Sequence, residues 1–172
     1  MNLKEAILKE HSKRQVIKIL RWVGKDKKRF NELMKLFLTG EDKVKTHAAW
    51  AFSYAAIEQP QLASPHLKNL IENLQKPGLH DAVKRNTLRF LQEINIPEKF
   101  QGMLTEICFR FLLTPKETIA TKCFAMTTAA NICKQHPELA RELKMIIDEL
   151  LLHPTPGITS RAKRTLKELS RV

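Results

Sequence analysis

The sequence has few glycines, few aromatic residues and only three cysteines. Its 172 residues include five glycines, eight prolines and three cysteines, and aromatic residues make up 6%. This composition argues against long disordered tracts and leaves little glycine for a loop that wraps a phosphate. No window alternates apolar and polar residues as a strand would, and apolar residues recur at helical spacing. The sequence therefore predicts an all-α fold.

The cysteines point to a reduced protein without disulfides. Cys108, Cys123 and Cys133 form no Cys-x-x-Cys motif, and three cannot all pair within one chain. Each lies in an apolar helical run, where a free cysteine behaves as a small apolar residue. We therefore expect reduced thiols and a cytoplasmic protein. The first ten residues lack a signal-peptide core, and no apolar run approaches the roughly 20 residues of a membrane span.

Motifs for catalysis and metal binding are also missing. No two of the six histidines are four residues apart, and no His-Glu-x-x-His, Walker A, Gly-x-Gly-x-x-Gly or Gly-x-Ser-x-Gly motif occurs. His47 lies nearest the basic surface described below, and we interpret it as an ordinary packed or surface residue. We expect no enzyme activity, no metal and no cofactor.

What the sequence does contain is an internal repeat. Residues 12–20, 44–52, 83–91 and 120–128 align with one another, and residues 162–169 fit after one deletion. The aligned positions Lys13, Lys45, Lys84, Thr121 and Lys163 are 32, 39, 37 and 42 residues apart. Intervals near ~40 residues are typical of two-helix repeats. The repeat predicts stacked helix pairs in which each pair contacts only its neighbours.

Prolines and capping residues mark the expected helix boundaries. Ser64 and Thr114 are candidate N-caps, and each is followed by a proline at the first helical position. We expect about ten helices in five pairs, within a single domain of residues 1–172. Their ranges are 2–10, 13–23, 26–38, 41–57, 65–76, 81–94, 98–113, 115–135, 137–153 and 158–172.

The repeated unit resembles that of the HEAT family, within the HEAT and armadillo type of helical repeats. Two of the repeats carry an apolar first helix, then an aspartate, then a second helix that opens with Val-Lys. In one repeat these are Leu67–Leu74, Asp81, and Val83 with Lys84. In the other they are Phe30–Leu38, Asp42, and Val44 with Lys45. The resemblance implies a right-handed α-α superhelix, a HEAT-like α-solenoid. It also implies a scaffold or binding role.

Positive charge is concentrated in the second helices of the pairs. The chain carries a net charge of +12, and the second helices contribute +10 of it. In HEAT-like solenoids these helices usually line the concave binding face. Positions one, five and eight after the aligned lysine share one helix face. They predict a basic stripe whose binding residues are Arg14, Lys18, Arg21, Trp50, Arg85, Arg89, Lys122, Arg164 and Lys167.

Such a stripe predicts a non-catalytic module that binds an acidic protein or a DNA or RNA backbone. Trp50 is either a core residue or a platform on which a base stacks. The arginines and Lys18 either bind the partner or only form a solvated face. The helix-opening lysines have a structural interpretation, in which Lys13, Lys45, Lys84 and Lys163 pair with Asp42 and Asp81 and join neighbouring repeats.

Two other functions are consistent with the same residues. Some alkylpurine DNA glycosylases are built from HEAT-like repeats, and this chain resembles them in architecture. Those enzymes keep an acidic residue beside aromatic platforms in a basic groove. Here Trp50 has no carboxylate beside it in the predicted stripe, because Glu93 lies on another side of its helix. The second hypothesis is therefore a DNA glycosylase or a degenerate DNA-binding relative of one. The third hypothesis is a structural adaptor whose basic charge serves solubility.

Overall fold

The computed structural model describes residues 1–171, and no strand occurs among them. Backbone contacts divide the chain into two compact units, Met1–Glu93 and Ile94–Val172. We call them unit 1 and unit 2. The predicted all-α fold of the HEAT-like solenoid class is confirmed. No helix within residues 1–171 is both long enough and apolar enough to cross a membrane.

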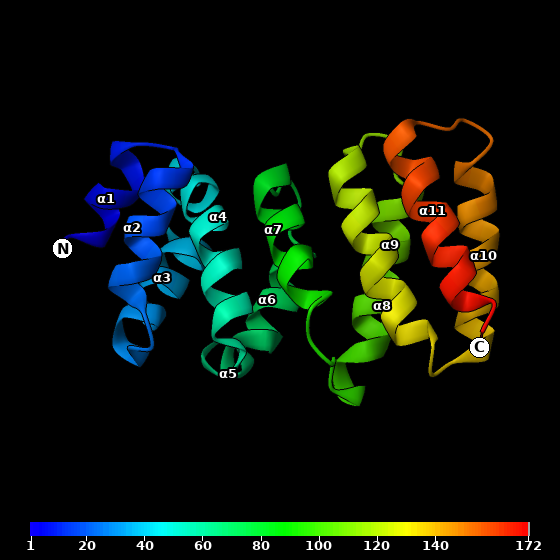
Figure 1. Cartoon of the computed structure of the whole chain (residues 1–172), viewed down its shortest axis with the longest axis horizontal. Helices are drawn as coiled ribbons and strands as arrows, with labels where there is room; N and C mark the ends of the chain where they lie inside the picture. Colours follow the sequence, from blue (N-terminus) through cyan, green and yellow to red (C-terminus); the bar gives the residue numbers. More distant parts are fainter. Residues whose placement is uncertain (172) are drawn as a thin grey trace. The chain divides into compact units, whose positions relative to one another are not determined.

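Unit 1 is a stack of helix pairs centred on one long helix, α4 (Figure 1). α4 packs against α1, α2, α3 and α7. Figure 1 shows α2, α4 and α7 in front, with α3 and α6 behind them. The elements of this unit are α1 (Leu3–Lys9), α2 (Lys13–Val23), α3 (Lys27–Thr39), α4 (Asp42–Glu58), α5 (Pro60–Ala63), η1 (Ser64–His66), α6 (Leu67–Asn73) and α7 (Asp81–Leu91).

Phenylalanines fill the core of unit 1. The rings of Phe37 and Phe52 stack with centroids 4.3 Å apart, and Phe90 meets Phe52 edge-on at 6.0 Å. All three side chains are fully buried. The remaining buried positions of α4 are mostly small, since Ala48, Ala49, Ala51, Ala55 and Ala56 are buried there. Small residues let neighbouring helices approach α4 closely, and this places second helices α4 and α7 side by side.

The first helix of the third pair differs from the prediction. We expected one helix over residues 65–76 capped by Ser64, but helical structure begins at Pro60 and passes through a short 3₁₀ turn before α6. The Ser64 hydroxyl does not cap a helix and instead donates to the Pro60 carbonyl at 2.8 Å. Pro65 lies inside this segment, where a proline removes an i→i−4 hydrogen bond, so the chain tightens locally.

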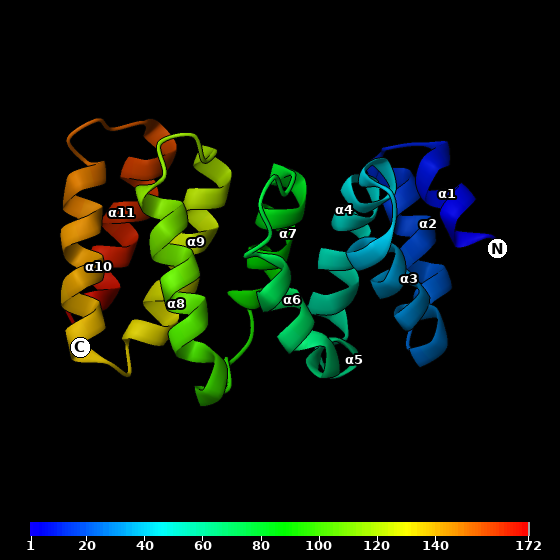
Figure 2. The ribbon, with the colours of Figure 1, turned by 180° about the vertical axis from the view of Figure 1, so that it is seen from behind.

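Unit 2 contains two helix pairs, α8 (Glu98–Leu113) with α9 (Ile119–Cys133) and α10 (Pro137–Leu150) with α11 (Pro156–Leu169). First helix packs on first helix and second on second, because α8 contacts α10 and α9 contacts α11. Within this unit, Figure 2 shows α8 and α10 in front, and Figure 1 shows α9 and α11 in front. This is the packing expected of stacked repeats.

Two helix starts in unit 2 were predicted wrongly. α9 begins at Ile119 rather than at residue 115, and its cap is Thr118, whose hydroxyl accepts from the Thr121 amide at 3.3 Å. The Thr114 hydroxyl is unavailable as a cap because it donates to the Arg110 carbonyl at 2.7 Å, at the end of α8. α11 begins at Pro156 rather than at residue 158, and Thr155 caps it.

The three cysteines form no disulfide with one another. Cys108 and Cys133 are buried, and Cys123 is half-buried with its thiol 3.6 Å from the Gly157 carbonyl. Burial raises the pKa of the Cys133 thiol to about 12 and raises that of Cys108 as well. These thiols therefore stay protonated and serve as packing groups.

Candidate binding site

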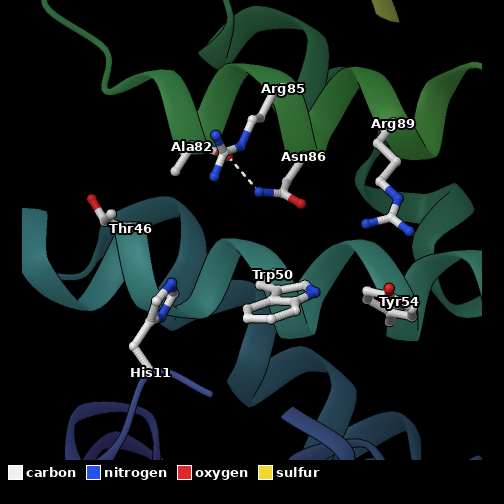
Figure 3. Close-up of a pocket in the computed structure, with 8 residues that line it drawn as sticks. All are labelled: His11, Thr46, Trp50, Tyr54, Ala82, Arg85, Asn86 and Arg89. Carbon is white, nitrogen blue, oxygen red and sulfur yellow. Dashed lines mark hydrogen bonds between the residues drawn. The ribbon is translucent and has the colours of Figure 1, made fainter. Parts of the chain in front are cut away.

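A polar pocket of about 270 Å³ lies between second helices α4 and α7 of unit 1 (Figure 3). We call it the aromatic–arginine pocket. One side comes from α4, the other from α7, and one further residue comes from the turn between α1 and α2. Its lining residues are His11, Thr46, Trp50, Tyr54, Ala82, Arg85, Asn86 and Arg89. None of these is a carboxylate.

Three aromatic rings form a row on the α4 side of the pocket. Trp50 and Tyr54 are four residues apart on α4, so they lie one helical turn apart on the same face. The His11 ring lies 5.6 Å from the Trp50 ring, and Figure 3 shows the three rings in line along the helix. Trp50 and Tyr54 are both half-buried, so their rings pack against the protein and still reach the pocket.

Two arginines on α7 face this row. Arg85 and Arg89 are also four residues apart, and Figure 3 shows both side chains directed from α7 toward the α4 side. Arg85 donates to the Asp81 carboxylate at 3.3 Å, within its own helix. The Arg89 guanidinium lies 4.4 Å from the centroid of the Tyr54 ring, and no carboxylate within residues 1–171 pairs with it. Its charge is therefore balanced by a ring face rather than by an anion.

One buried hydrogen bond joins the two sides of the pocket, and a second bond within α7 orients the side chain that accepts it. The Ser53 hydroxyl on α4 donates to the Asn86 side-chain oxygen on α7 at 3.0 Å. The Asn86 amide nitrogen then donates to the Ala82 carbonyl at 2.8 Å, which Figure 3 draws as a dashed line. Both side chains are buried, so these bonds are costly to break. They hold the aromatic row at a set distance from the arginines.

The charge of the pocket is carried by the arginines. Burial lowers the pKa of His11, and the neighbouring His47 ring and Arg85 lower it further. The His11 and His47 rings are 4.5 Å apart, so protonating both would place two cations side by side. The pKa of Tyr54 is lowered by its hydrogen bond with Arg89 and then by one with Trp50. Near neutral pH the lining is therefore cationic, with a neutral imidazole.

The helix pairs stack with second helix against second helix, which is the packing of helical repeat families. A family model described as HEAT repeat domain matches residues 3–169, almost the whole chain. The chain belongs to the HEAT repeat family. No curated protein matches it. Membership indicates a scaffold or binding module in general terms, and the comparisons give no support to the expected likeness to alkylpurine DNA glycosylases.

The HEAT repeats bring three of the nine predicted binding residues, Trp50, Arg85 and Arg89, into one pocket. The others lie elsewhere. Arg14, Lys18 and Arg21 are exposed on α2, where Arg14 pairs with Glu10 at 3.1 Å. In unit 2, Arg164 and Lys167 are exposed on α11, whereas Lys122 on α9 lines a small pocket with Glu149 and His153. One stripe through all nine stays a prediction.

One of the expected lysine–aspartate pairs is present, but it does not join two repeats. Lys45 Nζ lies 2.9 Å from the Asp42 carboxylate, as expected. Asp42 is, however, the first residue of α4 itself, so this pair closes the first turn of one helix rather than joining two repeats. The Lys45 ion pair, chiefly through its hydrogen bond, holds the pKa of Asp42 below its usual range. His47 is half-buried against the Ile7 carbonyl, 3.3 Å from its Nδ1.

Sequence reasoning missed two residues of the pocket. Tyr54 has a clear signal, because it lies four residues after Trp50, yet the expected stripe used Ser53, which is buried and bonds to Asn86. His11 has no signal of this kind. It lies 39 residues before Trp50 in a turn, and only the packing of α1 and α2 on α4 brings it to the ring. Within residues 1–171, no three His, Cys, Asp or Glu side chains are grouped to hold a metal.

Proposed function

We propose that this HEAT repeat domain is a non-catalytic nucleic-acid-binding module whose docking point is the aromatic–arginine pocket. One observation carries the proposal: Arg89, with no carboxylate partner in the described chain, stands beside Trp50 and Tyr54 in a pocket lined by no acid. An arginine in such a place binds an external anion. The adjacent rings suit a flat, apolar group attached to that anion.

A nucleotide combines both features. Its phosphate is the anion that arginine binds through paired N–H donors, and its base is a flat π-system. Stacking of a base on an aromatic side chain contributes about 1–3 kcal/mol. Trp50 and Tyr54, like Arg85 and Arg89, are four residues apart, which is a rise of about 6 Å along the helix. The pocket therefore offers parallel rows for bases and for phosphates. An acidic protein would use the arginines but would leave the aromatic row without a role.

The same residues favour binding over catalysis. Removal of a damaged base requires a group that activates water or stabilises a cation, and such a group is usually a carboxylate. The nearest acid named above, Asp81, pairs with Arg85 and does not line the pocket. The buried thiols have raised pKa values and do not act as nucleophiles. We therefore propose docking without chemistry.

A binding titration at two salt concentrations tests the proposal. The probes are a single-stranded oligonucleotide and a poly-glutamate peptide, with the wild type and the double variant Arg85→Glu/Arg89→Glu. The control Lys116→Glu/Arg141→Glu makes the same change of charge at two exposed residues of unit 2. We expect the pocket variant to bind the oligonucleotide at least about tenfold more weakly, and the control to bind it nearly as well as the wild type.

The salt dependence distinguishes the mechanism. Binding to single-stranded phosphates should weaken with salt, with a slope of about −0.7 per phosphate neutralised. Equal losses in both double variants would mean that only net charge matters, which contradicts the pocket. Binding of poly-glutamate in preference to the oligonucleotide would identify an acidic protein as the partner and overturn the nucleic-acid assignment.

A further inference from the structure

Two pockets of unit 2 adjoin along its first helices, α8 and α10, which Figure 2 shows in front within this unit. The larger pocket, of about 700 Å³, is lined by Phe109 and Leu113 of α8 and by Leu139 of α10. The smaller pocket, of about 280 Å³, is lined by Ile146 and Leu150 of α10. Leu113 lines both, so the two pockets form one groove. We call it the α8–α10 groove.

Large apolar side chains are exposed to water along this groove. Seven such side chains are exposed within residues 1–171, and five of them lie in unit 2. Leu113, in the groove itself, is 50% exposed, and Met145 of α10 is 68% exposed. Met145 lies three residues after Glu142 and four before Glu149, so it shares a helix face with two residues that line the groove. Exposed apolar surface gathered in one place indicates an interaction site.

Gly102 supports the same interpretation independently. It lies in the second turn of α8 and lines the larger pocket. A glycine inside a helix destabilises the helix relative to alanine. A Cβ atom on Gly102 would meet nothing within 4 Å, and the backbone of Gly102 does not have a positive φ. Packing within the described chain therefore does not require glycine here. Its missing side chain keeps the groove open and lets a partner approach the backbone of α8 closely.

Negative charge follows the groove, although the chain as a whole carries +12. Glu106 and Glu142 line the larger pocket, and Glu149 lines the smaller one. None of the three forms a salt bridge within residues 1–171. The lining also holds Arg110 and Lys122, fewer cations than carboxylates. α8 and α10 together contain six acidic residues against four basic ones, whereas α9 and α11 contain one against five. The charge of this face therefore favours a basic partner.

We propose that the α8–α10 groove binds a basic amphipathic helix of a partner protein. Apolar side chains of that helix enter the two pockets, and its lysines and arginines pair with Glu106, Glu142 and Glu149. Leu139 and Ile146 line one pocket each and are seven residues apart on α10, a rise of about 10 Å. Apolar residues seven apart on the partner helix match this distance. The groove uses only residues of unit 2, so it goes beyond the nucleic-acid function and does not require it.

The probe is a labelled synthetic helix of about four turns, with leucines seven residues apart on one face and lysines beside them. One control peptide has the same composition in scrambled order, and another has glutamate in place of lysine. Each is titrated with the full chain and followed by fluorescence anisotropy. The chain is strongly basic, so its overall charge repels the lysine peptide and saturable binding must come from a local site. We expect the ordered lysine peptide to bind at least about tenfold more tightly than either control.

Two variants change the shape and the charge of the groove. Gly102→Leu fills the larger pocket and should weaken peptide binding at least about tenfold. Its melting temperature should be no lower than that of the wild type, because leucine favours a helix more than glycine does. Glu149→Lys should weaken binding at least about threefold. Asp148→Lys is its matched control and should bind as the wild type does, since Asp148 is exposed and adjacent but lines neither pocket.

No saturable binding of the ordered peptide, equal binding of the scrambled one, or tighter binding of the glutamate peptide would overturn the proposal. So would equal peptide binding by Gly102→Leu and the wild type. Sedimentation of the chain alone tests a second copy as the occupant: a dimer that Gly102→Leu dissociates would replace the basic partner by a second copy of this chain.

The two proposals of this article can fail separately. Gly102→Leu should leave oligonucleotide binding unchanged, because Gly102 does not line the aromatic–arginine pocket. Arg85→Glu/Arg89→Glu should weaken oligonucleotide binding and leave peptide binding intact. Loss of peptide binding in that double variant would place the peptide in unit 1 and overturn the groove.

Discussion

The two units are built from the same kind of helix pair, yet their pockets differ in place and in chemistry. In unit 1 the aromatic–arginine pocket lies between second helices α4 and α7. In unit 2 a wider pocket of about 700 Å³ lies between first helices α8 and α10, and Phe109, Leu113 and Leu139 line it. One surface is cationic and aromatic, and the other is mainly apolar. The repeat thus provides positions, while individual side chains decide what each position binds.

The amino-acid composition also differs between unit 1 and unit 2. Residues 1–93 contain 18 Lys and Arg against 10 Asp and Glu, a net charge of +8. Residues 94–172 contain 12 against 8, a net charge of +4. Both tryptophans and the one tyrosine also lie in unit 1. The proposed function places polyanion binding in unit 1, and the four predictions below challenge that contrast.

The largest effect should come from the core of unit 1. Phe52 is fully buried between Phe37 and Phe90, so Phe52→Ala should lower the free energy of unfolding by about 3–5 kcal/mol. Because repeats contact only neighbours, amide hydrogen exchange should show the loss of protection mostly within residues 1–93. Leu143→Ala, in the core of unit 2, is the matched variant. Equal loss of protection in both units would show that they unfold as one.

Removal of the Trp50 ring should weaken oligonucleotide binding. Trp50→Ala deletes the central ring of the aromatic row and should weaken binding by about 1–3 kcal/mol, with circular dichroism unchanged. Trp22→Ala is the matched control, because Trp22 does not line the pocket. The Trp22 ring packs beside Arg29 instead, and its centroid lies 5.1 Å from the guanidinium carbon. Similar losses in both variants, measured by fluorescence anisotropy, would contradict the assignment of the site to this pocket.

A smaller effect is expected at the apolar pocket of unit 2. The Thr105 hydroxyl there is buried without a hydrogen-bond partner within residues 1–171. Thr105→Val should therefore leave stability unchanged or raise it by about 1 kcal/mol. Thr128→Val, whose hydroxyl donates to the Phe124 carbonyl at 2.9 Å, should instead reduce stability. Chemical denaturation compares them, and a destabilised Thr105→Val would show that its hydroxyl is satisfied.

The smallest expected effect is a loss of stability of unit 1 at acidic pH. Burial lowers the pKa of His11 and of His66, both in unit 1. The unfolded chain therefore binds more protons than the folded one below the ordinary histidine pKa of about 6.5. Stability of unit 1 should decline as pH falls through that value, down to the lowered folded pKa values. Thermal denaturation at pH 7.5 and 5.5 measures the decline, and His11→Gln with His66→Gln should reduce it.

The helix boundaries show which parts of the secondary structure local sequence patterns predict. The predicted ranges 13–23 and 98–113 agree with α2 and α8 residue for residue. The prediction failed at Thr114 and Ser64, although both have the expected Ser/Thr-Pro pattern. Each hydroxyl donates to a carbonyl four residues earlier instead of accepting from an amide ahead of it. The pattern alone does not choose between these two bonds, because both are short-range and of similar energy.

The predicted binding residues divide in the same way. Helical spacing grouped Trp50, Arg85 and Arg89, which do line one pocket, because residues four apart share a face wherever the helix lies. Lys122 was assigned to the same face, yet it lines a pocket with the ends of α8 and α10. Its helix starts four residues later than expected, and the prediction had no information on which neighbours that helix meets.

The amino-acid sequence alone predicts the helical repeat, the excess of positive charge and the arginines of the second helices. These are properties of spacing and composition, which a helix of 3.6 residues per turn converts directly into faces. Packing between elements brings His11 to Trp50, buries Ser53 against Asn86, and leaves the Asn73 amide nitrogen without an acceptor within residues 1–171. Each of these depends on residues more than thirty positions apart or on space left between packed elements, and no local pattern encodes either.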